Sequence, residues 1–251
     1  MAVDLRDVVT VLLPGTGSDD DYVRRAFGAP LRAAGATVIA PAPQPERLLE
    51  GYRQALGEAA RDIAGRGGRM AVGGVSIGAA VAVEWALAHP DRVVAVLAAL
   101  PAWSGSPDTA PAAAAARYSA HRLREDGLAG ATAQMRATSP AWLAEELSRS
   151  WAAQWPALPE AMEAAAGYVA PTTAELARLT VPLAAVAAED DPVHPIEVAR
   201  AWVAAAPRAA LRTVTLAEMG ADPSVLGAGC VAALQGVADA RTATAVEGAE
   251  R

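Results

Sequence analysis

The segment whose residue types and spacing best suit nucleophilic catalysis is Gly74-Val75-Ser76-Ile77-Gly78, which has the form Gly-x-Ser-x-Gly. It follows a short apolar run and precedes an alanine-rich run with helical spacing, Ile77–Ala88. A serine on a sharp strand-to-helix turn is held in a strained backbone conformation, and small neighbours let the turn close. The Ser76 hydroxyl would then project at the carboxyl edge of a sheet. The Ile77 amide, at a helix start, would favour an oxyanion.

A second candidate segment is Asp190-Asp191-Pro192-Val193-His194-Pro195, which follows the apolar run Val181–Ala187. A carboxylate in such a loop can hold an imidazole in one tautomer and stabilise its positive form. Either Asp190 or Asp191 could take this role. Alternatively, both carboxylates only cap the helix that begins near Pro195, because acidic groups are favoured at helix N-termini.

Histidine is scarce, and this limits any mechanism that needs an imidazole base. The sequence has three histidines, His89, His121 and His194. His89 ends the helix that follows Ser76, so we expect it to be structural, as a donor or positive group suits a helix C-terminus. His121 lies in a segment rich in arginine, which favours a solvated helix face.

The elements that must position these residues alternate between strands and helices. Apolar runs predict strands at Val8–Leu13, Thr37–Ala40, Met70–Val72, Arg92–Leu100, Val181–Ala187 and Leu211–Leu216. Helical spacing predicts helices at Tyr22–Ala34, Pro45–Ile63, Ile77–Ala88, Ile196–Ala205 and Pro223–Ala238. Parallel strands need crossover connections, and uniformly apolar strands need cover on both faces. The fold class is therefore α/β, with a mostly parallel sheet flanked by helices.

This alternation is interrupted in the middle of the chain. After Trp103, helical patterns predominate: Ala112–Glu125, Leu128–Ala137, Ala141–Gln154 and Pro159–Tyr168. We expect residues 104–177 to form a helical lid inserted into a core of residues 1–103 and 178–240. Residues 241–251 are polar and alanine-rich, which predicts a flexible tail.

The sequence resembles the α/β-hydrolase family over roughly residues 7–238, and three segments carry the resemblance. They are Leu12-Leu13-Pro14-Gly15-Thr16-Gly17, the serine pentapeptide with the following His89-Pro90-Asp91-Arg92-Val93, and Asp190–Pro195. The resemblance implies a helical lid and an ester-type hydrolase that acts through an acyl-enzyme, with Ser76 as nucleophile. It also implies that the amides of Thr16 and Ile77 bind the oxyanion, and that Asp191 is the acid.

One position departs from the family. Where the family has a Gly-His pair before the final helix, this sequence has Gly220-Ala221, so the usual base is missing. Four explanations are open. His194 acts from the acid loop; His121 reaches down from the lid; Asp222 or Glu218 replaces the base; or the histidine has been lost, naturally or by engineering. Proton transfer would require His194 to reach Ser76, which the sequence does not specify.

Composition narrows the function classes. The chain has 251 residues, a net charge of −7 and one cysteine. An acidic chain with dispersed arginines does not suit nucleic acid, and one cysteine with three separated histidines does not suit a zinc site. The longest apolar runs are shorter than the roughly 20 residues that span a membrane, and the acidic N-terminus does not resemble a signal peptide. We therefore expect a cytoplasmic protein that uses no cofactor or metal.

The predicted function is a serine hydrolase that cleaves small apolar esters or thioesters, with Ser76, Asp191 and His194 as catalytic residues. Its general base is non-standard or missing. Two alternatives follow from that doubt: a catalytically silent ligand-binding protein on a hydrolase scaffold, and a lyase or cyclase that uses the same pocket. The expected partner is a small molecule, not a membrane or a nucleic acid.

Overall fold

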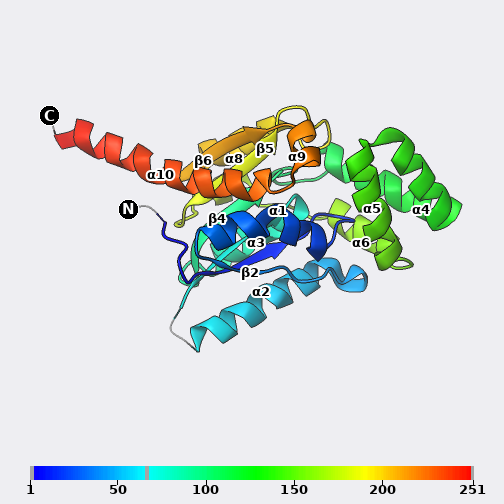
Figure 1. Ribbon diagram of the computed structural model, residues 1–251, viewed down its shortest axis with the longest axis horizontal. Coiled ribbons are helices and arrows are strands. Elements are labelled where there is room, and N and C mark those ends of the chain that lie inside the picture. The colour runs from blue at the N-terminus through cyan, green and yellow to red at the C-terminus, as the bar shows by residue number, and fades with distance from the viewer. Residues whose placement is uncertain (1–2, 66–67, 250–251) are drawn as a thin grey trace.

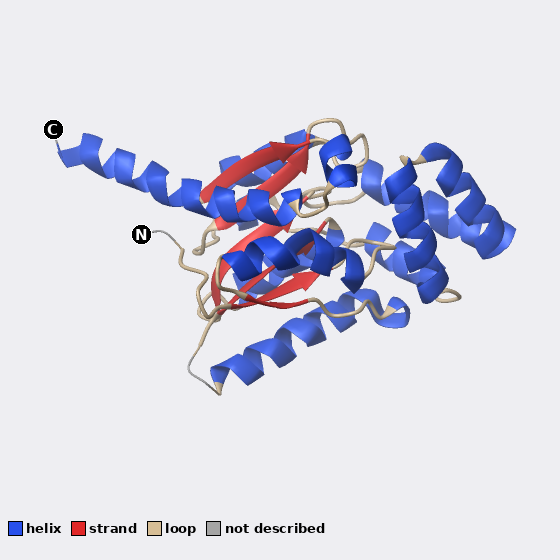
Figure 2. Ribbon diagram, in the orientation of Figure 1, coloured by secondary structure: helices blue, strands red, loops and turns tan. Residues whose placement is uncertain are grey.

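The structure, a computed structural model, describes residues 3–65 and 68–249. Within these residues six strands form one sheet in the order β2-β1-β3-β4-β5-β6, and every neighbouring pair is parallel. The strands are β1 (Val9–Leu13), β2 (Thr37–Ile39), β3 (Met70–Val75), β4 (Val93–Ala99), β5 (Leu183–Ala188) and β6 (Ala209–Val214). The prediction of a parallel α/β sheet is confirmed (Figure 2).

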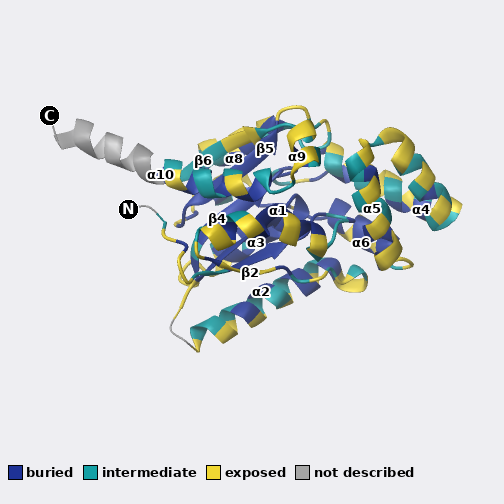
Figure 3. Cartoon of the chain, viewed as in Figure 1, coloured by how far each residue is buried: buried dark blue, intermediate teal, exposed yellow. Residues whose placement is uncertain are grey.

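Helices cover both faces of the sheet (Figure 1). One face packs against α1 (Asp20–Ala33) and α10 (Val225–Ala249), and the other against α2 (Leu48–Ala64), α3 (Ile77–Ala88) and α8 (Ile196–Ala205). Successive strand residues point to opposite faces, so Leu12 enters the core beside α1 while Leu13 enters the core beside α3. The four central strands β1, β3, β4 and β5 are therefore almost wholly buried, as Figure 3 shows. The edge strands β2 and β6 are exposed or half-buried.

The helical segment between β4 and β5, residues 104–177, lies beyond the carboxyl ends of the strands (Figures 1 and 2). It contains α4 (Pro111–Thr138), α5 (Ala141–Gln154), α6 (Leu158–Ala166) and the short α7 (Thr173–Leu176). The two helices expected at Ala112–Glu125 and Leu128–Ala137 join in α4, with a break at Gly127, whose φ is 67° and ψ is 179°. That this segment is a separate lid stays a prediction.

Three further details differ from the sequence predictions. A short 3-10 helix, η1 (Pro45–Arg47), precedes α2, and α9 (Leu216–Ala221) occupies a segment that was expected to be a loop. Capping explains α9, since Thr215 and Glu218 form a capping box around its first turn. Helix α10 runs to Ala249, past the expected end at Ala238, so it reaches into the segment predicted to be a tail. Flexibility of the tail stays a prediction, and residues 250–251 lie outside the described residues.

Within the part of the chain that the structure describes, no helix has the length and apolar character needed to cross a membrane.

Candidate active site

Ser76 occupies the turn between β3, which ends at Val75, and α3, which begins at Ile77. Its backbone has φ 55° and ψ −116°, a conformation that side-chain-bearing residues rarely adopt and that costs of the order of 1–3 kcal/mol. The Ser76 amide donates to the Ala99 carbonyl oxygen at 2.9 Å, which ties the turn to the end of β4. Neighbouring strands thus hold the serine at the carboxyl edge of the sheet, as the pentapeptide predicts.

The two glycines of the pentapeptide are required by close backbone packing. A Cβ atom on Gly74 or on Gly78 would lie 2.3 Å from the Leu13 carbonyl oxygen of β1. Gly15, in the loop after β1, lies against the serine itself, since a Cβ there would be 3.6 Å from Ser76 Cβ. The first strand, the loop after it and the serine turn therefore meet at one point.

Asp191 and His194 form a compact unit in the loop after β5. Asp191 Oδ1 accepts hydrogen bonds from the backbone amides of Val193, at 2.8 Å, and His194, at 3.2 Å. Its Oδ2 lies 2.8 Å from His194 Nδ1. Pro192 lies within this turn and Pro195 follows it, and both restrict the backbone. One carboxylate therefore fixes both the backbone and the ring of the histidine three residues later.

The imidazole bridges this carboxylate and the serine. His194 Nε2 lies 3.0 Å from Ser76 Oγ, across 118 residues of sequence. Because an ionised carboxylate only accepts hydrogen bonds, the Nδ1 proton points to Asp191, and Nε2 is left to accept the Ser76 hydroxyl proton. This arrangement can make serine nucleophilic, because the base is within reach of its proton and is itself oriented by a third group.

Asp191 has a surrounding that keeps it ionised. Burial raises the pKa of Asp191. The hydrogen bond and charge interaction with His194 and the hydrogen bonds from the Val193 and His194 amides lower this pKa by more than burial raises it. The pKa of Asp191 therefore lies below its ordinary value. The side chains of Asp191 and His194 are 8% and 17% exposed. The carboxylate is thus charged and largely shielded from water, which strengthens its effect on the ring.

One expected oxyanion donor, the Ile77 amide, directly follows Ser76 in the chain, and the other, the Thr16 amide, belongs to the loop after β1. The Ile77 amide is the first of α3, and the first amides of a helix have no partner within that helix. Gly15 and Thr16 line the same pocket as Ser76 and His194. The positive end of α3 also favours negative charge at this position.

The competing candidates for acid and base all have other partners. Asp190 Oδ1 accepts from the Leu216 amide at 2.7 Å, so it caps the start of α9. Glu218 belongs to the capping box of α9, and Asp222 accepts from both the amide and the hydroxyl of Ser224. These carboxylates act as helix and turn caps, and Asp190 caps α9 and not the helix near Pro195 that the sequence suggests.

The other two histidines lie away from the serine. His89 ends α3, where its ring stacks on Trp85 at 4.4 Å between ring centroids and its Nδ1 lies 3.1 Å from the Trp85 carbonyl oxygen. His121 lies on an exposed part of α4 and is outside the pocket lining. Ala221, at the position where the family places its histidine, is the exposed last residue of α9.

The pocket over Ser76 is a cavity of about 610 Å³ between the sheet edge and the helical segment. Its walls are mainly apolar and include three of the six tryptophans, Trp103, Trp142 and Trp151. Helix α9 adds Leu216 and Met219 to the wall, although the sequence predicts a strand as far as Leu216 and no helix between it and Pro223. Among the described residues, no group of three or more His, Cys, Asp or Glu side chains is arranged to hold a metal ion.

Comparison with solved structures shows the same fold in several hydrolases. A carboxylesterase of the thaumarchaeon Nitrososphaera gargenis has a TM-score of 0.65 at 15% identity, with 85% of this chain and 83% of that chain covered. An enol-lactonase from Burkholderia xenovorans LB400 has a TM-score of 0.60 at 18% identity, with 84% of this chain and 83% of that chain covered. A hydrolase from Pseudomonas aeruginosa PA01 has a TM-score of 0.61 at 21% identity, with 90% of this chain and 89% of that chain covered.

Sequence comparison identifies the family. No sequence among the curated proteins matches the chain. The family described as serine aminopeptidase, S33, matches residues 38–220, which include the serine turn, the helical segment and the Asp191–His194 unit. With most of the sequence matched and the fold of the solved hydrolases, the chain belongs to the serine aminopeptidase S33 family of α/β-hydrolases.

Proposed function

We propose that this protein is a serine hydrolase that cleaves small apolar esters or thioesters through an acyl-enzyme. The observation that carries the proposal is the continuous chain of hydrogen bonds from Asp191 through His194 to Ser76, at 2.8 and 3.0 Å. In this proposal Ser76 is the nucleophile, His194 the general base and Asp191 the acid that orients it. In this proposal the base comes from the same loop as the acid and not from the position of Ala221.

The acylation step follows from this geometry. Ser76 Oγ forms a bond to the substrate carbonyl carbon while its proton passes to His194 Nε2, and Asp191 stabilises the resulting imidazolium. The carbonyl oxygen becomes an oxyanion, which the Thr16 and Ile77 amides stabilise. When the tetrahedral centre collapses, its bond to the leaving oxygen or sulfur breaks, and His194 returns the proton to that atom.

Deacylation repeats the sequence with water. His194 Nε2 removes a proton from a water molecule, whose oxygen bonds to the acyl carbon, and the Ser76 oxygen leaves and recovers the proton. The products are a carboxylic acid and an alcohol or thiol. Neither step needs a cofactor.

The pocket lining favours an apolar ester over a substrate with a free amino group. A substrate ammonium group would need an uncommitted carboxylate in the pocket. Of the described residues that line the pocket, the carboxylates are Asp191, which binds His194, and Glu146, which is paired with Arg25 and Arg149. Both carboxylates already have partners, whereas apolar walls favour an apolar acyl or alcohol group.

The alternatives of a silent binding protein and of a lyase or cyclase rested on the absence of a base at Ala221. In this proposal His194 is the base, so the alanine at position 221 favours neither alternative.

We also propose that the helical segment, residues 104–177, acts as the lid of this pocket, because it supplies Trp142, Trp151 and much of the remaining wall.

A fluorophosphonate probe tests the nucleophile. We expect covalent labelling of the wild-type protein at Ser76, no labelling of Ser76→Ala, and release of p-nitrophenol from short-chain p-nitrophenyl esters by the wild type alone. The probe should be checked on an active serine esterase in the same buffer. If that control is labelled and the wild type is not, the acyl-enzyme mechanism is wrong.

A further inference from the structure

The loop after β1, residues 14–19, carries the Thr16 amide, yet little inside the loop itself holds it. A backbone hydrogen bond closes the loop, from the Ser18 amide to the Gly15 carbonyl oxygen at 3.1 Å. Gly17 has a φ of 69°, which a glycine adopts without strain, so the sequence leaves the backbone free at this point. The loop therefore depends on its neighbours for its conformation.

Helix α5 of the helical segment contacts the second half of this loop directly. Gln154 Nε2 donates to the Ser18 carbonyl oxygen at 3.0 Å and to Ser150 Oγ at 2.8 Å. Gln154 is buried, with 5% of its surface exposed. The Trp151 ring packs on Gly17 so closely that a Cβ there would be 2.7 Å from Trp151 Nε1. The two residues that follow Thr16, Gly17 and Ser18, are therefore both in contact with α5.

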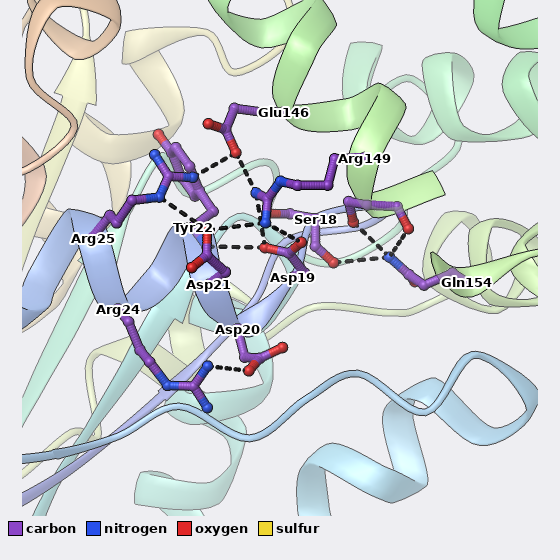
Figure 4. A network of polar contacts seen from close by, with 11 residues as sticks. Ser18, Asp19, Asp20, Asp21, Tyr22, Arg24, Arg25, Glu146, Arg149 and Gln154 are labelled. Atoms are coloured by element: carbon purple, nitrogen blue, oxygen red, sulfur yellow. Dashed lines mark hydrogen bonds and ion pairs between the residues drawn. The ribbon is translucent and has the colours of Figure 1, made fainter. Parts of the chain in front are cut away.

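Arg149, also on α5, fixes the end of the loop through charge (Figure 4). Its Nη1 lies 3.2 Å from Asp19 Oδ2 and 2.9 Å from Asp21 Oδ2, and its Nη2 lies 2.6 Å from Glu146 Oε2. Asp19 is the N-cap of α1 and accepts from the Tyr22 amide at 2.9 Å. Arg149 thus ties α5 to the residue at which the loop becomes helix.

The network also contains Arg25, which pairs with Glu146 at 2.6 Å and with Asp21 at 3.0 Å. Three carboxylates, Asp19, Asp21 and Glu146, therefore share two guanidinium groups. Removing Arg149 would leave three negative charges facing one positive charge across the contact between α5 and α1. This repulsion would push α5 away from the loop.

We propose that Arg149 and Gln154 are positioning residues that hold the loop of residues 14–19 so that the Thr16 amide meets the oxyanion. This inference rests on the proposed function. Since oxyanion donors act on charge that develops in the transition state, loss of positioning should lower kcat more than it raises KM. The helical segment would then contribute to catalysis through the oxyanion site as well as by covering the pocket.

The test compares Arg149→Met with Arg124→Met. Arg124 makes the same kind of ion pair within the helical segment, with Glu160 and Glu163, and it lies outside the pocket lining. For a p-nitrophenyl ester we expect kcat to fall about tenfold in Arg149→Met, with KM within about twofold of wild type, as expected for a lost transition-state interaction. Arg149→Lys should recover part of kcat, and Arg124→Met should match the wild type.

A second measurement does not depend on turnover. Hydrogen exchange followed by mass spectrometry should show faster exchange of the 14–22 segment in Arg149→Met and in Gln154→Leu than in wild type or Arg124→Met. Equal exchange in all four proteins, or a rise in KM with kcat unchanged, would overturn the positioning role. A wild type that neither hydrolyses esters nor reacts with the fluorophosphonate would disprove the proposed function, and the exchange data would still decide the positioning of the loop.

Discussion

At the residue scale, the imidazole is placed by a four-residue turn and not by a distant loop. Asp191 binds the amides of Val193 and His194 and the His194 ring, so the carboxylate and the imidazole form one local unit. This unit needs only one contact from elsewhere in the fold, the one to Ser76. An imidazole therefore meets the serine even though Ala221 stands at the position the family uses for histidine.

Replacing His194 tests this placement. We expect His194→Ala to lower kcat by at least about 100-fold, because a general base contributes about 10²–10⁴-fold to such a step. His121→Ala is the matched control, since His121 is exposed on α4 and outside the pocket lining, and it should leave kcat unchanged. Steady-state hydrolysis of a p-nitrophenyl ester measures both. Equal rates for the two variants would exclude His194 as the base.

At the element scale, the serine turn depends on how closely β1, β3 and α3 pack. The Leu13 carbonyl oxygen lies where a Cβ on either glycine of the turn would be, so these elements can approach only if both positions are glycine. Ser76 is then strained by the turn that exposes its hydroxyl, and the surrounding sheet supplies the energy that maintains the strain.

Adding one methyl group should reveal this packing. We expect Gly78→Ala to lower the free energy of unfolding by about 2–3 kcal/mol, because overpacking against fixed backbone is costly. Gly57→Ala in α2 is the control, since a Cβ there meets only the flexible end of Arg61 at 3.5 Å. It should raise stability by about 0.5–1 kcal/mol. Urea unfolding measures both, and a Gly78→Ala protein as stable as the wild type would contradict the packing argument.

At the scale of the whole molecule, the Asp191 unit links the stability of the fold to pH. The pKa of Asp191 in the folded protein lies below its ordinary value of 3.8, so the unfolded chain binds this proton more readily. The sign follows: the stabilisation is complete above the ordinary pKa and is lost as the pH falls through the lower, folded-state pKa.

We therefore expect Asp191→Asn to show a smaller loss of stability than the wild type as the pH is lowered from about 5 to below the ordinary pKa of the carboxyl group. Urea unfolding at several pH values across this range measures the difference between the two proteins. Parallel pH profiles for wild type and Asp191→Asn would mean that the folded protein does not lower this pKa.

Much of the fold could be predicted from the sequence, because its signals are local. Uninterrupted apolar runs gave the strands to within a few residues, and helical spacing with clear ends gave α3, α5 and α8 at their observed bounds. Helix α9 was missed because its signal is a capping box within a six-residue segment, which is too short for periodicity to show. The contribution of Leu216 and Met219 to the pocket wall therefore could not be predicted from the sequence.

The sequence by itself determined the serine turn, the parallel sheet and the family, since each depends on residue types at fixed spacing. Only the tertiary structure decided which histidine meets Ser76, because a contact between residues 118 positions apart requires that β3 and β5, which lie on either side of β4, end at the same edge of the sheet. It also decided that Asp190, Glu218 and Asp222 act as caps. A carboxylate that caps a helix and one that orients a base have the same local sequence signal, and only the partners supplied by the fold distinguish them.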